Sequence, residues 1–122
     1  MKTLLIKSLI AAMLTIVTPN TGEELQQVRC TCYLPTGNRT ADGTVPYEGI
    51  IASNRDHLGD VALLYTLNGE FIGFFECRDI GGHRKLRNGT AIDVYRDNMD
   101  RAWEWVHTYG DYVQILWVKG EG

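Results

Sequence analysis

Residues 61–77 read VALLYTLNGEFIGFFEC, two apolar runs on either side of Asn68-Gly69. Val, Ile, Tyr and Phe favour strands, and Asn-Gly accepts the positive φ angles that a two-residue turn requires. The stretch therefore predicts a β-hairpin. In its second strand Cys77 and Asp79 share one face by the period of two, which puts a carboxylate at the end of an apolar face, at the rim of a core.

Shorter strand patterns occur on both sides of the hairpin. Four further runs are apolar and bounded by turn residues: residues 28–33, 48–53, 90–95 and 111–118. Residues 80–89 (IGGHRKLRNG) are rich in glycine and in cations, which predicts a loop. With the hairpin, the tally is about six short strands, which favours a small β-barrel over a sandwich.

One helix is expected late in the chain. Apolar residues recur there at i, i+3, i+4 and i+7, which predicts an inward face of Met99, Ala102, Trp103 and Val106. Asp97 is the expected N-cap and Gly110 the expected C-cap. Trp105 lies about 200° around the helix from Trp103, so the two cannot both face the core.

The composition allows one domain and excludes one class of partner. The chain has 122 residues, 44% hydrophobic and 22% charged, which fits a single compact domain. Twelve Lys and Arg stand against fifteen Asp and Glu, a net charge of −3. Because nucleic-acid binders concentrate positive charge against phosphates, a nucleic-acid partner is not expected.

The N-terminus has the pattern of an export signal. Lys2 and Lys7 precede ten uncharged, mostly apolar residues, 8–17. This run is shorter than the roughly 20 residues of a membrane span, so it predicts a signal peptide over residues 1–21 and no stable span. No small-x-small cleavage site follows, and a buried or amphipathic N-terminal helix is the alternative. Export leaves residues 22–122 as a secreted or cell-wall-associated domain.

Three cysteines, Cys30, Cys32 and Cys77, make an odd set. Without a second CxxC or a His pair, a structural zinc site is not expected. An exported protein favours one disulfide and one spare thiol, and because Cys30 and Cys32 share a strand face, either can be the partner of Cys77. A nucleophilic cysteine with a histidine partner is the remaining alternative.

Two carboxylates carry the chemical argument. Asp79 directly precedes Ile80-Gly81-Gly82, and Asp93 interrupts the apolar run AIDVY at residues 91–95. A charge in an apolar strand costs several kcal/mol unless it is paired or lies in a cleft. Asp93 is therefore either paired with a nearby cation or a general acid of raised pKa beside a second carboxylate. The candidate cations are Arg78, Arg84, Lys85, Arg87 and Arg96.

Residues 75–95, which combine D-x-G-G with I-D-V-Y, resemble the 3D domain, named for three aspartates. Relatives of that domain include the catalytic barrel of membrane-bound lytic transglycosylase A and stationary-phase muralytic proteins of Firmicutes. Residues 36–43 (TGNRTADG) are similar to the T-A-x-G loop of this family, and residues 49–52 to its G-V-V-A strand. The resemblance covers roughly residues 30–118.

The resemblance implies a fold and an activity. The fold is mainly β, a small six-stranded double-psi β-barrel over residues 22–122 with one late α-helix. The reaction is non-hydrolytic cleavage of the β-1,4 bond between N-acetylmuramic acid and N-acetylglucosamine in peptidoglycan, which gives 1,6-anhydro products without a cofactor or metal. Asp93 matches the catalytic acid of the family and Asp79 its supporting aspartate. Substrate contacts are expected at the groove edge, from Thr40, Gly81, Gly82 and Asn54. The protein is expected to be a monomer.

The chain departs from the family at two places. The first aspartate should follow the G-V-V-A strand, where Asn54 stands nearest that position and Asp56 is the only nearby acid, so this aspartate is missing or displaced. This departure favours a non-catalytic wall-binding or wall-loosening barrel of the expansin kind, and an ordinary hydrolase is a third possibility. The loop between Asp79 and Asp93 is longer than in the family, and its Lys85 and arginines either contact peptide-stem carboxylates or form a solvated face. An exposed tryptophan of the late helix is able to stack on a sugar.

Overall fold

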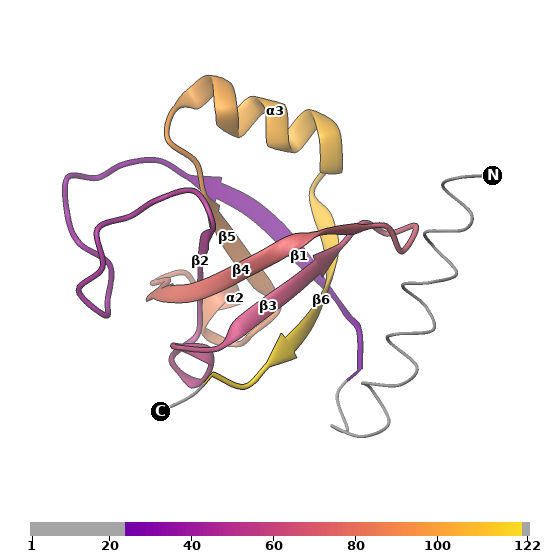
Figure 1. Ribbon diagram of the computed structural model, residues 1–122, viewed down its shortest axis with the longest axis horizontal. Helices are drawn as coiled ribbons and strands as arrows, with labels where there is room; N and C mark the ends of the chain where they lie inside the picture. Colours follow the sequence, from indigo (N-terminus) through magenta and orange to yellow (C-terminus); the bar gives the residue numbers. More distant parts are fainter. Residues whose placement is uncertain (1–23, 121–122) are drawn as a thin grey trace.

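The computed structural model describes residues 24–120, so the predicted signal peptide over residues 1–21 lies outside the described residues. Figure 1 shows a barrel with one long helix beside it. The elements are β1 (Gln26–Tyr33), β2 (Ile50–Ser53), η1 (Arg55–His57), β3 (Val61–Tyr65), β4 (Phe71–Ile80), α2 (Arg84–Arg87), β5 (Ala91–Tyr95), α3 (Met99–Tyr109) and β6 (Tyr112–Val118).

The six strands close into one barrel in the order β1-β5-β2-β4-β3-β6. The pairs β1·β5 and β2·β4 are parallel, and the other four pairs are antiparallel. Exchanging β1-β2-β3 for β4-β5-β6 leaves every neighbour relation unchanged, which is the internal symmetry of a double-psi barrel. The prediction of a mainly β fold with a closed six-stranded barrel and one late helix is confirmed.

The core fills the barrel with alternate residues of the strands. Leu64, Val94 and Ile115 have no exposed surface, and each stabilises the fold by roughly 1.5–3 kcal/mol through burial. Helix α3 lies against β1 and contributes Trp105, whose ring meets that of Phe75 edge-on at a centroid distance of 5.6 Å. Between α3 and α2, the outer face of β1 and β5 carries the polar side chains of Thr31 and Asp93.

The predicted hairpin is confirmed, with a different turn. Strands β3 and β4 pair antiparallel on either side of Asn68-Gly69. The N–H of Gly69 donates to the carbonyl of Thr66 at 2.9 Å, and Gly69 has φ 87°. In residues 24–120 no residue other than glycine has positive φ, so Asn68 does not take the conformation that a two-residue turn needs. The connection is therefore a longer loop that ends in a left-handed glycine.

Helix α3 is present, but its cap and its inward face differ from the prediction. Asn98, not Asp97, is the N-cap, and its side chain accepts from the N–H of Arg101 at 2.9 Å. Trp105 is 5% exposed, whereas Trp103 is 55% exposed. Met99 is exposed to the same extent. The predicted inward positions of Met99 and Trp103 are wrong because a second apolar stripe, Ala102, Trp105 and Tyr109, has the same helical spacing and packs on the core.

A short helix replaces part of the predicted loop before β5. Helix α2 is capped by His83 and buries Leu86. A Cβ on Gly81 would lie 2.1 Å from Cδ1 of Leu86, so only glycine allows this close approach. Among the helices within residues 24–120, none has the length and apolar character needed to cross a bilayer.

Candidate active site

The two candidate carboxylates lie in one row across four neighbouring strands. Thr31 of β1 is opposite Asp93 of β5, Asp93 is opposite Ala52 of β2, and Ala52 is opposite Asp79 of β4. Directly opposite residues point to the same face, here the outside of the barrel. Asp93 and Asp79 are two strands apart, and adjacent strands of a sheet lie about 4.8 Å apart. Only the methyl group of Ala52 lies between the two aspartates.

A β-bulge brings Asp79 into this row. The register passes from Ile51 opposite Cys77 to Ala52 opposite Asp79, which leaves Arg78 as the extra residue. Cys77 points into the core with no exposed surface, and Asp79 points outward. The expectation that these two side chains share a face is wrong, because the bulge interrupts the alternation of the strand.

Three donors fix the carboxylate of Asp79. Its Oδ1 accepts from the N–H of Ala41 at 3.0 Å and from the N–H of Ile80 at 2.9 Å. Its Oδ2 accepts from the hydroxyl of Tyr33 at 3.3 Å. Burial, and the charge of Asp79, raise the pKa of Tyr33, so this hydroxyl keeps its proton and remains a donor. Asp79 is thus held in a single orientation.

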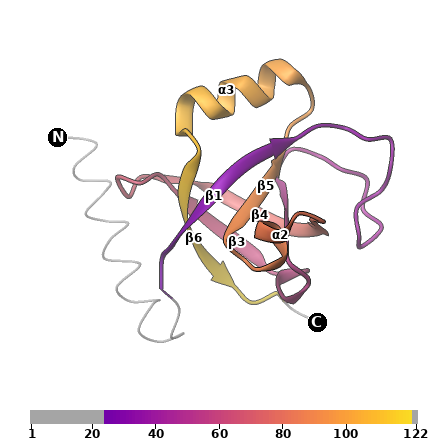
Figure 2. The ribbon, with the colours of Figure 1, turned by 180° about the vertical axis from the view of Figure 1, so that it is seen from behind.

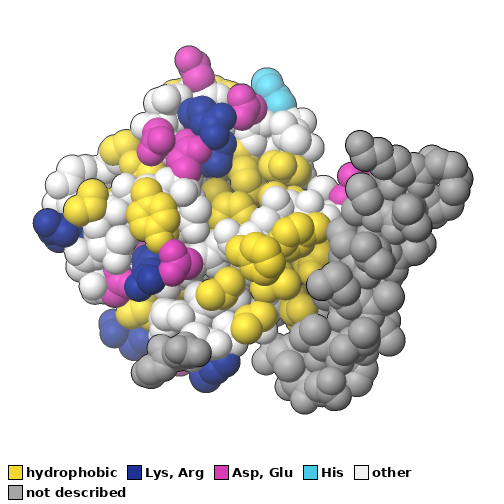
Figure 3. Space-filling model, in the orientation of Figure 1, with side chains coloured by type: hydrophobic (Ala, Val, Ile, Leu, Met, Phe, Trp, Pro, Cys, Tyr) yellow, Lys and Arg dark blue, Asp and Glu magenta, His cyan; other side chains and the backbone are white. Residues whose placement is uncertain are grey.

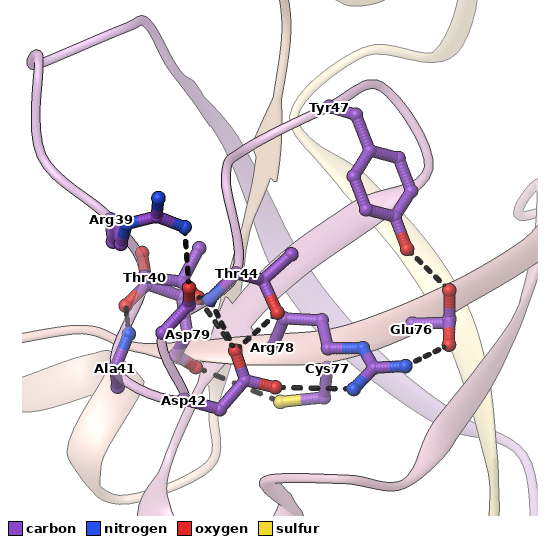
Figure 4. Close-up of polar contacts among 11 residues, drawn as sticks. Arg39, Thr40, Ala41, Asp42, Thr44, Tyr47, Glu76, Cys77, Arg78 and Asp79 are labelled. Carbon is purple, nitrogen blue, oxygen red and sulfur yellow. Dashed lines mark hydrogen bonds and ion pairs between the residues drawn. The ribbon is translucent and has the colours of Figure 1, made fainter.

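The bulge residue also holds the loop that supplies the donor Ala41. Arg78 donates to Asp42 at 3.2 Å and to Glu76 at 2.6 Å, and Figure 4 shows its guanidinium between the two carboxylates. Glu76 also accepts from the hydroxyl of Tyr47, farther along the same loop. One arginine therefore ties the loop to β4 at the place where Asp79 is fixed.

Thr40, a predicted substrate contact, is part of this loop. It is buried, its hydroxyl donates to Asp42 at 2.7 Å, and the same oxygen accepts from the N–H of Thr44 at 3.0 Å. Burial acts to raise the pKa of Asp42, but the hydrogen bonds from Thr44 and Thr40 outweigh it and lower that pKa to about 2. Asp42 is thus an ionised acceptor that organises the turn.

Asp93 has a different environment. It accepts one hydrogen bond, from the hydroxyl of Thr31 at 2.9 Å. Within residues 24–120 no ion pair involves Asp93, so the predicted pairing with a neighbouring cation is wrong; two of the candidates, Arg78 and Arg96, pair with other carboxylates. Burial raises the pKa of Asp93, the bond from Thr31 opposes this, and the charge of Asp79 adds to it. A carboxyl in this state keeps its proton to higher pH than an ordinary aspartate, as a general acid requires.

Asp93 lines a groove of about 540 Å³ between β1, β5 and α2. Figure 2 shows these three elements on one side of the molecule. Arg29 and Lys85 bring positive charge to the groove, and His83 and the exposed hydroxyl of Thr31 bring polar groups. Sequence reasoning did not single out Arg29 or His83. Arg29 enters the groove because it pairs with Ala91, a register that no local pattern shows.

The other predicted contact residues lie beside this groove rather than in its lining. The side chain of Asn54 accepts from the N–H of His57 at 3.2 Å and caps η1. The N–H of Gly81 donates to the carbonyl of Ser53 at 3.0 Å. Gly82 has open space where a Cβ would stand. Asn54 is also close to the loop before β5, because its Nδ2 would lie 3.3 Å from a Cβ on Gly89.

The cysteines do not provide a nucleophile. All three thiols are free, and the expected disulfide is absent because β5 and β2 separate β1, which carries Cys30 and Cys32, from β4, which carries Cys77. Burial raises the pKa of Cys30 and of Cys77 to about 12, and that of Cys32 to about 11. Reactive thiols have lowered pKa values, so these groups are inert by comparison. In the described part of the chain, no group of three or more His, Cys, Asp or Glu side chains is arranged to hold a metal ion.

Comparisons with known proteins add no assignment. No protein-family model matches the chain, and a search of curated proteins finds no match.

Proposed function

We propose that the protein is a secreted peptidoglycan lytic transglycosylase of the 3D-domain kind, with Asp93 as the catalytic acid and base. The observation that carries the proposal is the state of Asp93: a half-buried carboxyl of raised pKa, without an ion pair among the described residues, on the wall of a groove. Asp79 lies two strands away and is locked by three donors. A proton donor beside a fixed charge is the arrangement that glycosidic cleavage uses.

One catalytic carboxyl is sufficient for this reaction. Asp93 protonates the glycosidic oxygen as the bond from that oxygen to C1 of the muramic acid breaks. The C6 hydroxyl of the same sugar then bonds to C1, and its proton passes to the Asp93 carboxylate. No water is consumed, and the acid is regenerated. Because the substrate supplies the nucleophile, the second reacting carboxylate of ordinary glycosidases is not required.

Asp79 acts on Asp93 and on the developing charge of the sugar. Its negative charge raises the pKa of Asp93, which keeps the acid protonated at higher pH. The same charge, fixed before the reaction begins, favours the positive charge that builds up at C1 as the bond breaks. Asp79 is thus a positioning and electrostatic residue of this site.

Digestion of purified peptidoglycan tests the proposal. The wild-type protein is expected to release muropeptides one water lighter than the hydrolytic products. Asp93→Asn should lose this activity by about 10²–10⁴-fold, the usual contribution of a general acid. Asp100→Asn is the matched control, because Asp100 is exposed in the first turn of α3 and is not among the residues that line the groove. Full activity in Asp93→Asn would overturn the assignment, and products of hydrolytic mass would identify a hydrolase.

A second candidate is a non-catalytic barrel that binds or loosens the wall. It is favoured by Asn54, which stands where the family has its first aspartate and whose side chain is engaged in capping η1. This function predicts that the protein sediments with insoluble peptidoglycan and releases no fragments. The digestion experiment therefore separates the two candidates directly.

A further inference from the structure

We infer that the glycan groove continues past Thr31 onto an apolar platform, formed by Met99 and Trp103 of α3, that binds one further uncharged sugar ring of the same strand. The inference rests on the proposed function in one respect, that the ligand is a glycan. The inference goes beyond the proposed function by assigning a subsite on α3, outside the row of Thr31, Asp93, Ala52 and Asp79.

The platform is the floor of a second cleft. A hollow of about 250 Å³ lies between α3 and β1, and its lining includes Thr31, Cys32, Met99, Trp103 and Asp111. Met99 and Trp103 are one helical turn apart on the same side of α3, and each is 55% exposed. By contrast, Trp105 on the inward side of the helix is 5% exposed. Large apolar side chains left in water beside a hollow mark a binding surface.

The second cleft is continuous with the groove that holds Asp93. Thr31 lines both hollows, and its hydroxyl donates to Asp93 at 2.9 Å. Figure 2 shows α3 on one side of β1 and α2 on the other, so a ligand that crosses the outer face of β1 meets both clefts. An extended chain that fills the groove at Asp93 therefore continues toward Trp103, and its next ring beyond the groove reaches the platform.

The chemistry of the second cleft selects a sugar ring. A pyranose has apolar C–H faces and a rim of hydroxyl groups. The indole of Trp103 and the thioether of Met99 offer a flat apolar floor, while Thr31 and Asp111 stand at the side as hydrogen-bonding groups. A lipid chain offers no hydrogen-bond donor to the carboxylate of Asp111, and that carboxylate repels an anionic ring. An uncharged N-acetylated sugar satisfies both parts of the cleft.

Tryptophan fluorescence tests the platform without catalysis. The Asp93→Asn protein, full length, is titrated with stem-free peptidoglycan tetrasaccharide and with the corresponding disaccharide. Trp103 is the most exposed tryptophan of the described residues, so tetrasaccharide binding should change the emission. Adding Trp103→Ala should abolish this change and raise the Kd for the tetrasaccharide about tenfold, the loss of one stacking contact. The Kd for the disaccharide should not change.

Phe74→Ala is the matched control. Phe74 is an aromatic residue 67% exposed, and it belongs to the β3–β4 hairpin, over which Figure 3 shows hydrophobic side chains gathered. Its removal should leave both Kd values unchanged. If Trp103→Ala binds the tetrasaccharide as tightly as its parent, the platform is wrong while the proposed function stands. If the parent binds neither sugar, the platform also falls, and the digestion experiment with the wild-type protein decides the proposed function by itself.

Discussion

The two halves of the barrel hold equivalent positions in the row from Thr31 to Asp79, and different residue types occupy these positions in each half. When β1-β2-β3 is exchanged for β4-β5-β6, Ala52 corresponds to Asp93 at the centre of the row, and Thr31 corresponds to Asp79 at its flanks. One half thus has an acid at the centre, and the other has an acid at the flank. In both halves the central position is within a strand and the flanking position is at the end of the row. The residue type at each position therefore decides where the carboxylate lies.

The difference between the two acids comes from the donors around them. Asp79 lies near the end of β4, where the N–H of Ala41 in the loop of residues 34–49, the N–H of Ile80 and the hydroxyl of Tyr33 supply three hydrogen bonds. Asp93 lies inside a strand whose N–H groups are used in the sheet, and it accepts one bond, from Thr31. Because Ala52 is small, the charge of Asp79 acts on Asp93 with only a methyl group between them. One acid is thereby fixed, and the other is able to exchange a proton.

The largest effect on stability is expected from Asp79→Ala. The N–H groups of Ala41 and Ile80 then lose their acceptor, and the free energy of unfolding should fall by about 1–3 kcal/mol. Asp79→Asn is the control, because its amide oxygen still accepts from both groups, and it should lose less. Denaturation with urea measures both changes. Equal stability of Asp79→Ala and the wild type would contradict the view that this acid holds the loop.

Asp93→Asn is expected to raise the free energy of unfolding, the opposite of Asp79→Ala. The folded pKa of Asp93 is raised above the unfolded value of about 3.9, so its ionisation disfavours the folded state. The contribution of the protonated group is present below about pH 3.9 and is lost as the pH rises through the folded pKa. Asp93→Asn should therefore be more stable than the wild type at pH 7 and equally stable at pH 3. Thermal unfolding at both pH values measures the difference in stability. A variant less stable than the wild type at pH 7 would show that ionisation of Asp93 does not destabilise the folded state.

Features with a local pattern were predictable from the sequence. The hairpin around Asn68-Gly69 and the late helix follow from apolar spacing and turn residues, and Asp93 stands out as a charge within an apolar strand. The choice between Trp103 and Trp105 was not predictable, because two apolar stripes share the spacing of the helix. Only the core contact of Trp105 with Phe75 decides between them.

Features that depend on long-range pairing could not be derived in the same way. The row from Thr31 to Asp79 requires the two parallel pairs β1·β5 and β2·β4, which join segments far apart in the chain. The outward position of Asp79 requires a bulge at Arg78, and nothing in the alternation of β4 marks that residue as extra. Arg29 is a groove residue solely through its register with Ala91. The candidate acids were therefore found from the sequence, but their common face was not.

The smallest and most specific effects concern the pH dependence of activity. In the proposed reaction Asp93 must be protonated for the first step, so the basic limb of the kcat/KM profile should follow its pKa. Thr31→Val removes a hydrogen bond that lowers this pKa, and the limb should move to higher pH. Asp79→Asn removes a charge that raises it, and the limb should move to lower pH. The release of anhydro-muropeptides at a series of pH values measures both displacements.

Opposite displacements would separate electrostatics from general damage to the fold. A loosened barrel exposes Asp93 to water and moves its pKa toward the ordinary value in both variants, so the two limbs would then shift in the same direction. Shifts of opposite sign require that Thr31 and Asp79 act on Asp93 from the two flanks of one row, one by a hydrogen bond and one by charge. In the double variant Thr31→Val with Asp79→Asn, independent actions should add, so the displacement should equal the sum of the two single displacements. A displacement that differs from this sum would mean that one flank acts on Asp93 through the other.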